Sequence, residues 1–193
     1  MESVSQSMED LKVAAQLFRE ERYEEAFEKY RILAERGTVT AQVLLGWMYQ
    51  VGKGVQDNLA EAKKWYEEAA VSQSAQAQFY LGNLYRTTGE YKQVFEWLER
   101  SASQEYSPAL YLLGQLYYVG EGVELDKQRA SVYFKQAAEK GHLFAQRNIA
   151  YDMIKGRHGI ARIPFGFLLM VRGLWRVIKV TLNDPNSDSI LRV

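Results

Sequence analysis

A short phrase recurs along the chain at nearly constant spacing, and this repetition constrains the fold more than any other feature. Its copies read AQVLLGWMY, AQFYLGNLY, ALYLLGQLY and AQRNIAYDM, and they begin at Ala41, Ala77, Ala109 and Ala145. The spacings are therefore 36, 32 and 36 residues. Periods of this length indicate a solenoid, in which each repeat is one small unit that buries its apolar face only against its neighbours.

Each phrase is expected to form the first helix of a helix–turn–helix pair. Within the first copy, Ala41, Leu45 and Tyr49 share one helical face, and Gly46 leaves room for a partner helix to approach closely. A glycine turn at 52–57 or at 120–126 then leads into a second helix, for which Asn58 and Glu61 have capping-box spacing. Small and aromatic residues recur along these second helices: Ala62, Trp65, Tyr66, Ala69 and Ala70, then Ala130, Tyr133, Phe134, Ala137 and Ala138.

Two further units follow the same order at lower fidelity. The unit that begins at Ala77 has its glycine loop shortened to residues 87–90, which explains the spacing of 32. A unit of the same short type spans Leu11 to Gly37. An offset of 104 residues places Gly166 and Gly173 where the first strong unit has Ala62 and Ala69. The sequence thus predicts about five units, with an array over residues 10–160 that follows a disordered, polar segment over residues 1–9.

The phrase A-x-x-x-L-G-x-x-Y-x-x-G-x-G-V-x-x-D and the later W-Y-x-x-A-A resemble the Sel1-like repeat family, a relative of the tetratricopeptide repeats. The strong matches cover residues 41–142. The resemblance implies an all-α fold, a right-handed α–α superhelix whose first helices line a concave groove. It also implies a protein-binding scaffold that helps to assemble complexes.

Positions that line the concave face in tetratricopeptide repeats define a candidate groove for a protein or peptide partner. They combine aromatic rings with hydrogen-bonding groups, which suits apolar anchoring and side-chain recognition. The alternative for each aromatic is a place in the core between repeats. The groove residues are Val43, Trp47, Gln50, Phe79, Asn83, Arg86, Tyr111, Gln115, Tyr118, Arg147 and Tyr151.

Composition argues against several other classes of function. Lysine plus arginine equals aspartate plus glutamate at 24 each, so no whole-chain basic field favours nucleic acid. Cysteine is absent, His142 and His158 both fall in expected turns, and no Gly-x-Ser-x-Gly or Ser-x-x-Lys context occurs. We therefore expect no cofactor, no metal site and no enzymatic activity. The N-terminus lacks the pattern of a secretory signal, and a cytoplasmic location is expected.

Residues 161–182 depart from the repeat because they form an apolar segment with a basic stripe, followed by a polar tail over 183–193. We expect a helix that begins near Pro164 and acts as the second helix of a divergent last unit. The candidate contact residues are Phe165, Leu169, Arg172, Trp175, Arg176 and Lys179. Cations near its centre disfavour a transmembrane span.

Four partners for this helix stay open: the solenoid itself, a second copy of the chain, another protein, and the surface of an anionic membrane. The sequence thus predicts a non-enzymatic adaptor that recruits a partner through the groove, through the apolar helix, or through both. The alternative is a scaffold anchored at the inner face of a membrane by residues 163–182.

Overall fold

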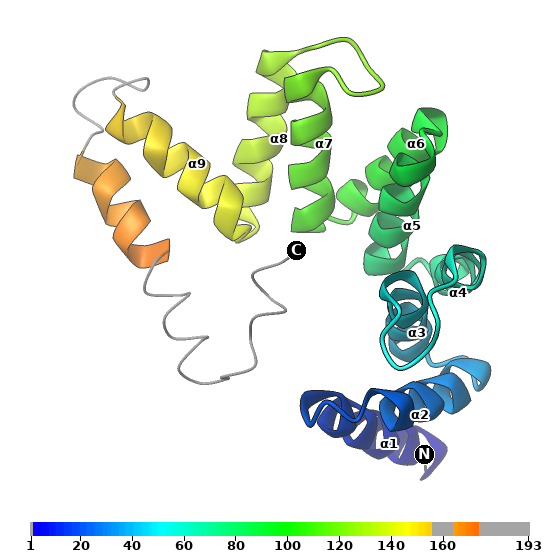
Figure 1. The fold of residues 1–193 in the computed structure, drawn as a ribbon. Helices are drawn as coiled ribbons and strands as arrows, with labels where there is room; N and C mark the ends of the chain where they lie inside the picture. The colour runs from blue at the N-terminus through cyan, green and yellow to red at the C-terminus, as the bar shows by residue number, and fades with distance from the viewer. Residues whose placement is uncertain (1, 156–163, 174–193) are drawn as a thin grey trace. The chain divides into compact units, whose positions relative to one another are not determined.

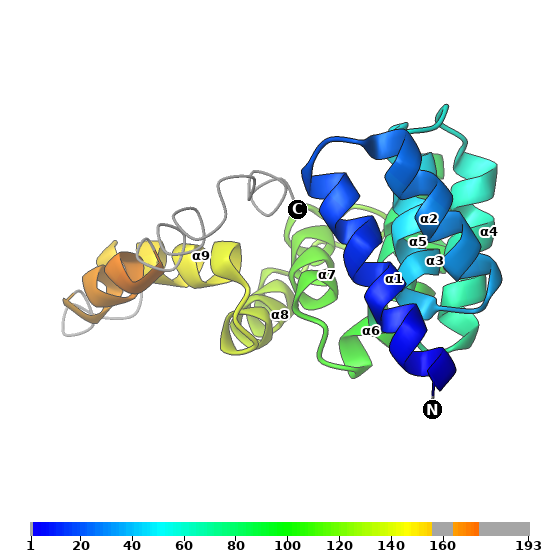
Figure 2. The same ribbon diagram turned by 90° about the horizontal axis from the view of Figure 1, so that it is seen from below.

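The computed structural model describes residues 2–155 and 164–173 of the chain, and its regular structure over these residues is helical throughout (Figures 1 and 2). Two compact units divide the chain, Met1–Gln104 and Glu105–Val193. The first contains α1 (Glu2–Arg19), α2 (Tyr23–Glu35), α3 (Val39–Val51), α4 (Leu59–Val71), α5 (Ala75–Thr88) and α6 (Tyr91–Ser103). The second contains α7 (Ser107–Val119), α8 (Lys127–Glu139), α9 (Leu143–Ile154) and a further helix over residues 164–173.

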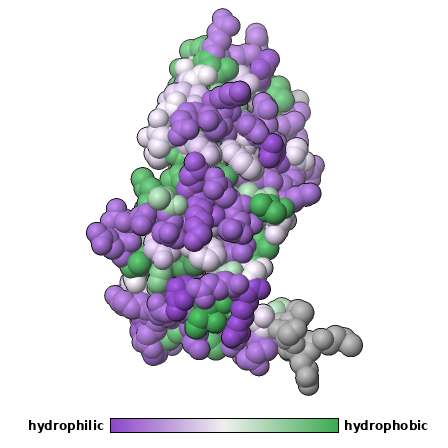
Figure 3. All heavy atoms as spheres, turned by 90° about the vertical axis from the view of Figure 1, so that its right-hand side faces the viewer, coloured by the Kyte–Doolittle hydropathy of each residue, from purple (hydrophilic) through white to green (hydrophobic). Residues whose placement is uncertain are grey.

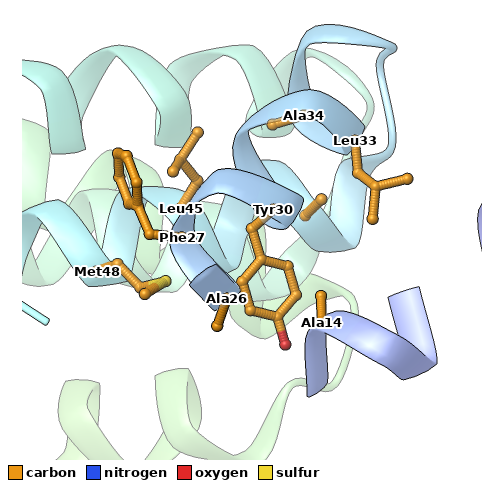
Figure 4. Packing of buried hydrophobic residues seen from close by; sticks show 9 residues of the cluster. Ala14, Ala26, Phe27, Tyr30, Leu33, Ala34, Leu45 and Met48 are labelled. Atoms are coloured by element: carbon orange, nitrogen blue, oxygen red, sulfur yellow. The ribbon is translucent and has the colours of Figure 1, made fainter. Parts of the chain in front are cut away.

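Successive helices form five helix–turn–helix pairs, three in the first unit and two in the second. In the first unit, each pair packs against the next, through α2 and α3 and then through α4 and α5. Within the first pair, small and aromatic side chains interdigitate: the ring of Tyr30 on α2 lies beside Ala14 on α1 and Ala26 on α2 (Figure 4). The predicted all-α solenoid of about five repeats is confirmed.

Glycines allow the two helices of a pair to approach closely. A Cβ built on Gly46 would lie 2.7 Å from the ring of Tyr66 and 3.2 Å from the carbonyl oxygen of Ala62. Gly114 has the same relation to Phe134, at 2.7 Å. The packing role predicted for this glycine is confirmed, because any larger residue would push the second helix away.

The glycine turn after α3 also joins neighbouring pairs. Gly52 ends α3 in the left-handed conformation, and Gly54 has a φ of +69°. A Cβ at Gly54 would overlap the backbone carbonyl of Tyr23, at the start of α2. The Lys53 ammonium lies 4.1 Å from the centre of the Tyr23 ring, so the turn packs on the preceding pair.

Only one half of the predicted capping box is made. The side-chain oxygen of Asn58 accepts hydrogen bonds from the backbone N–H groups of Ala60 and Glu61, as an N-cap does. The N–H of Asn58, which Glu61 would bind in a full box, instead donates to the carbonyl of Tyr49 at 2.8 Å. This bond ties the turn back to α3.

The prediction of a disordered segment over residues 1–9 is wrong, since α1 begins at Glu2. Neighbouring turns of this helix are linked by hydrogen bonds from Gln6 to Asp10 and from Lys12 to Glu9. Such pairs stabilise a helix even where few apolar residues mark it. The exposed side chains of α1 are largely polar.

The last pair is built from α9 and helix 164–173, which lie side by side (Figures 1 and 2). Gly166 is buried, and a Cβ there would lie 2.8 Å from the carbonyl oxygen of Ala150. Ala150 occupies the position of Gly46, and Gly166 that of Ala62, so the two small residues have exchanged sides. Residues 164–173 are helical, as expected for this segment. The expected helix start near Pro164 stays a prediction, because residues 156–163, like residues 174–193, lie outside the described part of the chain.

Candidate partner-binding surfaces

The first helices of the first unit place part of the predicted groove set in the core. Val43 on α3 is 2% exposed, and Phe79 on α5 is 8% exposed. First helices pack against second helices on more than one side, so apolar residues at these positions become inter-repeat core. The prediction that Val43 and Phe79 offer surface to a partner is therefore wrong.

The remaining predicted residues of this unit are more accessible. Trp47 is half-buried, and its ring packs edge-on against Phe18, with 5.8 Å between centroids. Gln50 accepts a hydrogen bond of 2.8 Å from the hydroxyl of Tyr66, whose pKa is raised by burial. Asn83 is half-buried and Arg86 is exposed. Trp47 and Gln50 thus have contacts within the fold already.

The first helices of the second unit hold their predicted residues further into solvent. Tyr118 on α7 is 52% exposed and Tyr151 on α9 is 50% exposed. Gln115 and Arg147 are also exposed. Gln115 and Tyr118 are three residues apart, and Arg147 and Tyr151 are four apart, so each pair shares one helical face. Each helix therefore presents one tyrosine beside one long polar side chain.

Tyr111 has a different role from Tyr118. Its ring stacks on that of His142, with 4.2 Å between centroids, and it also faces Phe134 and Phe144. The Nδ1 of His142 accepts a hydrogen bond from the N–H of Ala145 and so caps α9. Burial lowers the pKa of His142, which keeps the imidazole neutral and able to accept this bond. Tyr111 thus packs on the residue that caps α9, and both residues have a structural role at the start of this helix.

Only three of the six predicted contact residues of the C-terminal helix lie in the described part of the chain. Phe165 and Arg172 are exposed, Leu169 is half-buried, and Trp175, Arg176 and Lys179 lie outside the described residues. Sequence reasoning did not single out the other exposed apolar side chains of this helix. These are Phe167, Leu168, Met170 and Val171. The same 104-residue offset that aligned Gly166 would have found Phe167, Leu168 and Val171, because their counterparts on α4 are the polar residues Lys63, Lys64 and Glu67. The counterpart of Met170 is Tyr66, which is fully buried.

The first unit also has a shallow hollow of about 660 Å³ between the ends of α4 and α6, which the sequence did not predict. Trp97, Arg100 and Gln104 line one side of it, and Val71 and Gln78 line the other. The guanidinium of Arg100 lies over the Trp97 ring at 4.7 Å, and Gln104 donates a hydrogen bond to Gln78. The polar groups of Arg100, Gln104 and Gln78 that line the hollow thus already have partners within the fold.

In residues 2–155 and 164–173, no three His, Cys, Asp or Glu side chains gather so that they could hold a metal ion. No helix in the same part of the chain is long and apolar enough to cross a membrane.

Comparisons of sequence bring in distant relatives. An uncharacterized protein of Neisseria meningitidis, NMB1327, is 33% identical over 123 residues, which are 63% of this chain and 26% of that protein. Chitin synthase regulatory factor 3 of Schizosaccharomyces pombe is 26% identical over 150 residues, 73% of this chain and 16% of that protein. The chain thus spans only a minor part of the length of these relatives.

Solved structures show the same architecture. A Sel1 repeat protein from Oxalobacter formigenes superposes with a TM-score of 0.73 at 27% identity, over 86% of this chain and 72% of that one. A protective antigen of uropathogenic Escherichia coli, c5321, has an SLR fold and superposes with a TM-score of 0.59 at 25% identity, over 80% of this chain and 34% of that one.

A family profile for the Sel1 repeat matches residues 39–70, 75–106 and 107–142. These segments coincide with the pairs α3–α4, α5–α6 and α7–α8, and together they cover more than half of the chain. The pairs at either end follow the same packing pattern outside the matched residues. The chain therefore belongs to the Sel1 repeat family.

Proposed function

We propose that this protein is a non-catalytic scaffold that recruits a partner protein or peptide through the first helices of its repeats. Sel1 repeats commonly serve as protein-interaction scaffolds and are generally non-catalytic. The observation that carries the finer proposal is the pair of tyrosines, Tyr118 and Tyr151, each about half exposed on a first helix of the second unit.

These tyrosines suit a binding surface because about half of the surface of each side chain stays accessible. Lys127 and Lys155 lie 5.9 Å and 5.5 Å from their rings, at exposed sites where such contacts contribute only about 0.5–1 kcal/mol. A tyrosine side chain has only two rotatable bonds, so its ring supplies contact area at a low cost in conformational entropy when a partner binds. Gln115 and Arg147 would add hydrogen bonds beside them. A protein segment with apolar side chains and exposed carbonyl or carboxylate groups fits this surface best.

Site-specific photocrosslinking in the native host tests the proposal. A benzophenone amino acid at position 118 or 151 is expected to give the same discrete protein adduct, identified by mass spectrometry. The matched control is position 132, because Val132 is similarly exposed but lies on a second helix, α8. Adducts that are equally abundant from all three positions, or absent from 118 and 151, would contradict a role for the first helices.

A second candidate function is a scaffold held at a membrane surface by the C-terminal helix. The observation in its favour is that five large apolar side chains of helix 164–173 are between 46% and 55% exposed. The cytoplasmic location predicted from the sequence, and the self-association considered there, remain predictions. In both candidates the repeats hold a partner, and they differ in whether the last helix places the array at a lipid surface.

A further inference from the structure

Three second helices, α4, α8 and helix 164–173, share a set of outward positions, and helix 164–173 fills them with different chemistry. Counted from the small residue that packs on the first helix, these are the first, second, fifth and sixth following residues. On α4 they are Lys63, Lys64, Glu67 and Glu68; on α8 they are Ser131, Val132, Lys135 and Gln136; on the last helix they are Phe167, Leu168, Val171 and Arg172. A face that is polar or mixed elsewhere is therefore mainly apolar here.

On these three helices the positions face outward. Apart from Lys63, which is half-buried, all twelve are exposed. The face of the first unit that carries the second helices is predominantly hydrophilic (Figure 3). Phe167, Leu168 and Val171 are 55%, 51% and 53% exposed, although Gly166 packs on α9 as the register requires. The apolar residues thus lie on the side turned away from α9, where packing within the pair does not need them.

The charge of the surrounding sequence is also one-sided. Between Asp152 and Asp184 the chain has no aspartate or glutamate, whereas it has six of its 24 lysines and arginines. They are Lys155, Arg157, Arg162, Arg172, Arg176 and Lys179. The chain as a whole is neutral, so this concentration of positive charge is local.

We propose that helix 164–173 docks on an anionic lipid surface and lies in the plane of the interface. Phe167, Leu168 and Val171 would enter the boundary between headgroups and acyl chains, while Arg172 would meet lipid phosphates. The other cations of the segment would add to its attraction to anionic lipid through their charge. This proposal rests on the second candidate function and specifies its ligand. An outward apolar face with cations at its border and no acidic group is the combination that binds anionic interfaces.

The same observations disfavour a second copy of the chain as the occupant. Two identical helices related by a two-fold axis would bring their positive charges together without acidic partners from the same segment. A lipid surface accepts both features at once, because the apolar side chains are inserted and the cations are neutralised.

Vesicle flotation with the full-length protein tests the proposal. The protein is expected to float with phosphatidylcholine vesicles that contain about one third phosphatidylglycerol, and not with phosphatidylcholine alone. Binding should fall as salt rises from about 0.1 M to about 1 M, which shortens the screening length from about 10 Å to about 3 Å. Equal flotation with both vesicles, or none with either, would overturn the proposal.

A matched pair of variants separates the outward face from the general effect of losing an apolar residue. Phe167→Ser with Leu168→Ser should lower the vesicle-bound fraction at least about tenfold, since two inserted side chains are lost. Val132→Ser, at the position on α8 that corresponds to Leu168, should leave binding unchanged. An equal loss from both would show that the face of helix 164–173 has no special role.

A fluorescent probe gives a second result that does not depend on the folding of the double variant. The chain has no cysteine, so Leu168→Cys and Val132→Cys each provide a single labelling site. A polarity-sensitive dye at 168 should shift to the blue with anionic vesicles, whereas the same dye at 132 should not. If the dye at 168 shifts without vesicles, either when the protein concentration is raised or when an acidic partner protein is added, the lipid assignment is overturned. Crosslinking from positions 118 and 151 reports separately on recruitment of the protein partner.

Discussion

The two helices of one repeat approach so closely at Gly46 that a single added methyl group would not fit. Gly46→Ala would place its Cβ 2.7 Å from the Tyr66 ring, which is fully buried and bonded to Gln50. The Ala62 carbonyl oxygen lies on the same side at 3.2 Å. Overpacking of this kind costs about 1–3 kcal/mol, which exceeds the gain of about 1 kcal/mol in helix propensity. We expect lower stability in urea unfolding.

Gly173→Ala is the matched control for this substitution, because it adds the same methyl group to a helix at a place where no atom of the described residues lies within 4 Å. There the propensity gain is unopposed, and stability should stay constant or rise by up to about 1 kcal/mol. Equal destabilisation by the two substitutions would mean that close helix contact is not the reason for Gly46.

The glycine and alanine positions were also the residues that the sequence predicted best. A repeat compared with itself shows where a small residue recurs, and the structure places Gly46, Gly114 and Gly166 at close helix contacts. The direction of larger residues was harder to predict. Val43 and Trp47 lie one turn apart on the same helix, yet the first is buried and the second is partly exposed. Periodicity gives the face of a helix but not the depth of the neighbouring helix that covers it.

At the scale of the element, His142 links the start of α9 to pH. Its Nδ1 accepts the capping hydrogen bond only while the ring is neutral, and burial lowers its pKa below the value of about 6.5 in an unfolded chain. The unfolded chain therefore binds the proton more readily. The stability that neutral His142 contributes is complete above about pH 6.5 and is lost as the pH falls below that value toward the lower pKa of the folded protein.

We expect thermal unfolding to move to lower temperature between about pH 7.5 and about pH 5.5, and His142→Asn to reduce this change. Asparagine still caps a helix but does not titrate in this range. Circular dichroism melts of both proteins at the two pH values provide the measurement. An acid response that is identical in the variant would show that other groups cause it.

Elements as a whole were predicted more reliably than their ends. The shortened turn at 87–90 appears as the close succession of α5 and α6, with Gly89 in the left-handed conformation. Helix α1 was missed over residues 2–9 because polar side-chain pairs mark it rather than an apolar stripe. The hydrogen bond from the Asn58 N–H to Tyr49 was also out of reach, since it depends on how the turn folds back and not on local spacing.

At the scale of the whole molecule, the first unit has a core that needs no residue from the second. One cluster joins α1 to α4 around Tyr30 and Leu45, and the next joins α3 to α6 around Tyr66 and Leu81. Trp47 and Tyr49 pack against both clusters, so the two are continuous. Repeat proteins gain stability from each unit and from its contact with the next, and a run of three pairs suffices for folding.

A fragment of residues 1–104 is therefore expected to fold by itself. It should show a helical circular dichroism spectrum and a single cooperative transition in urea, with a slope smaller than that of the full chain because less surface is exposed on unfolding. Gly46→Ala should shift the midpoint of this fragment toward lower urea, since the contact that it disturbs lies wholly inside the fragment. A fragment without a cooperative transition, or one that is indifferent to Gly46→Ala, would show that the stability of these three pairs depends on the residues after Gln104.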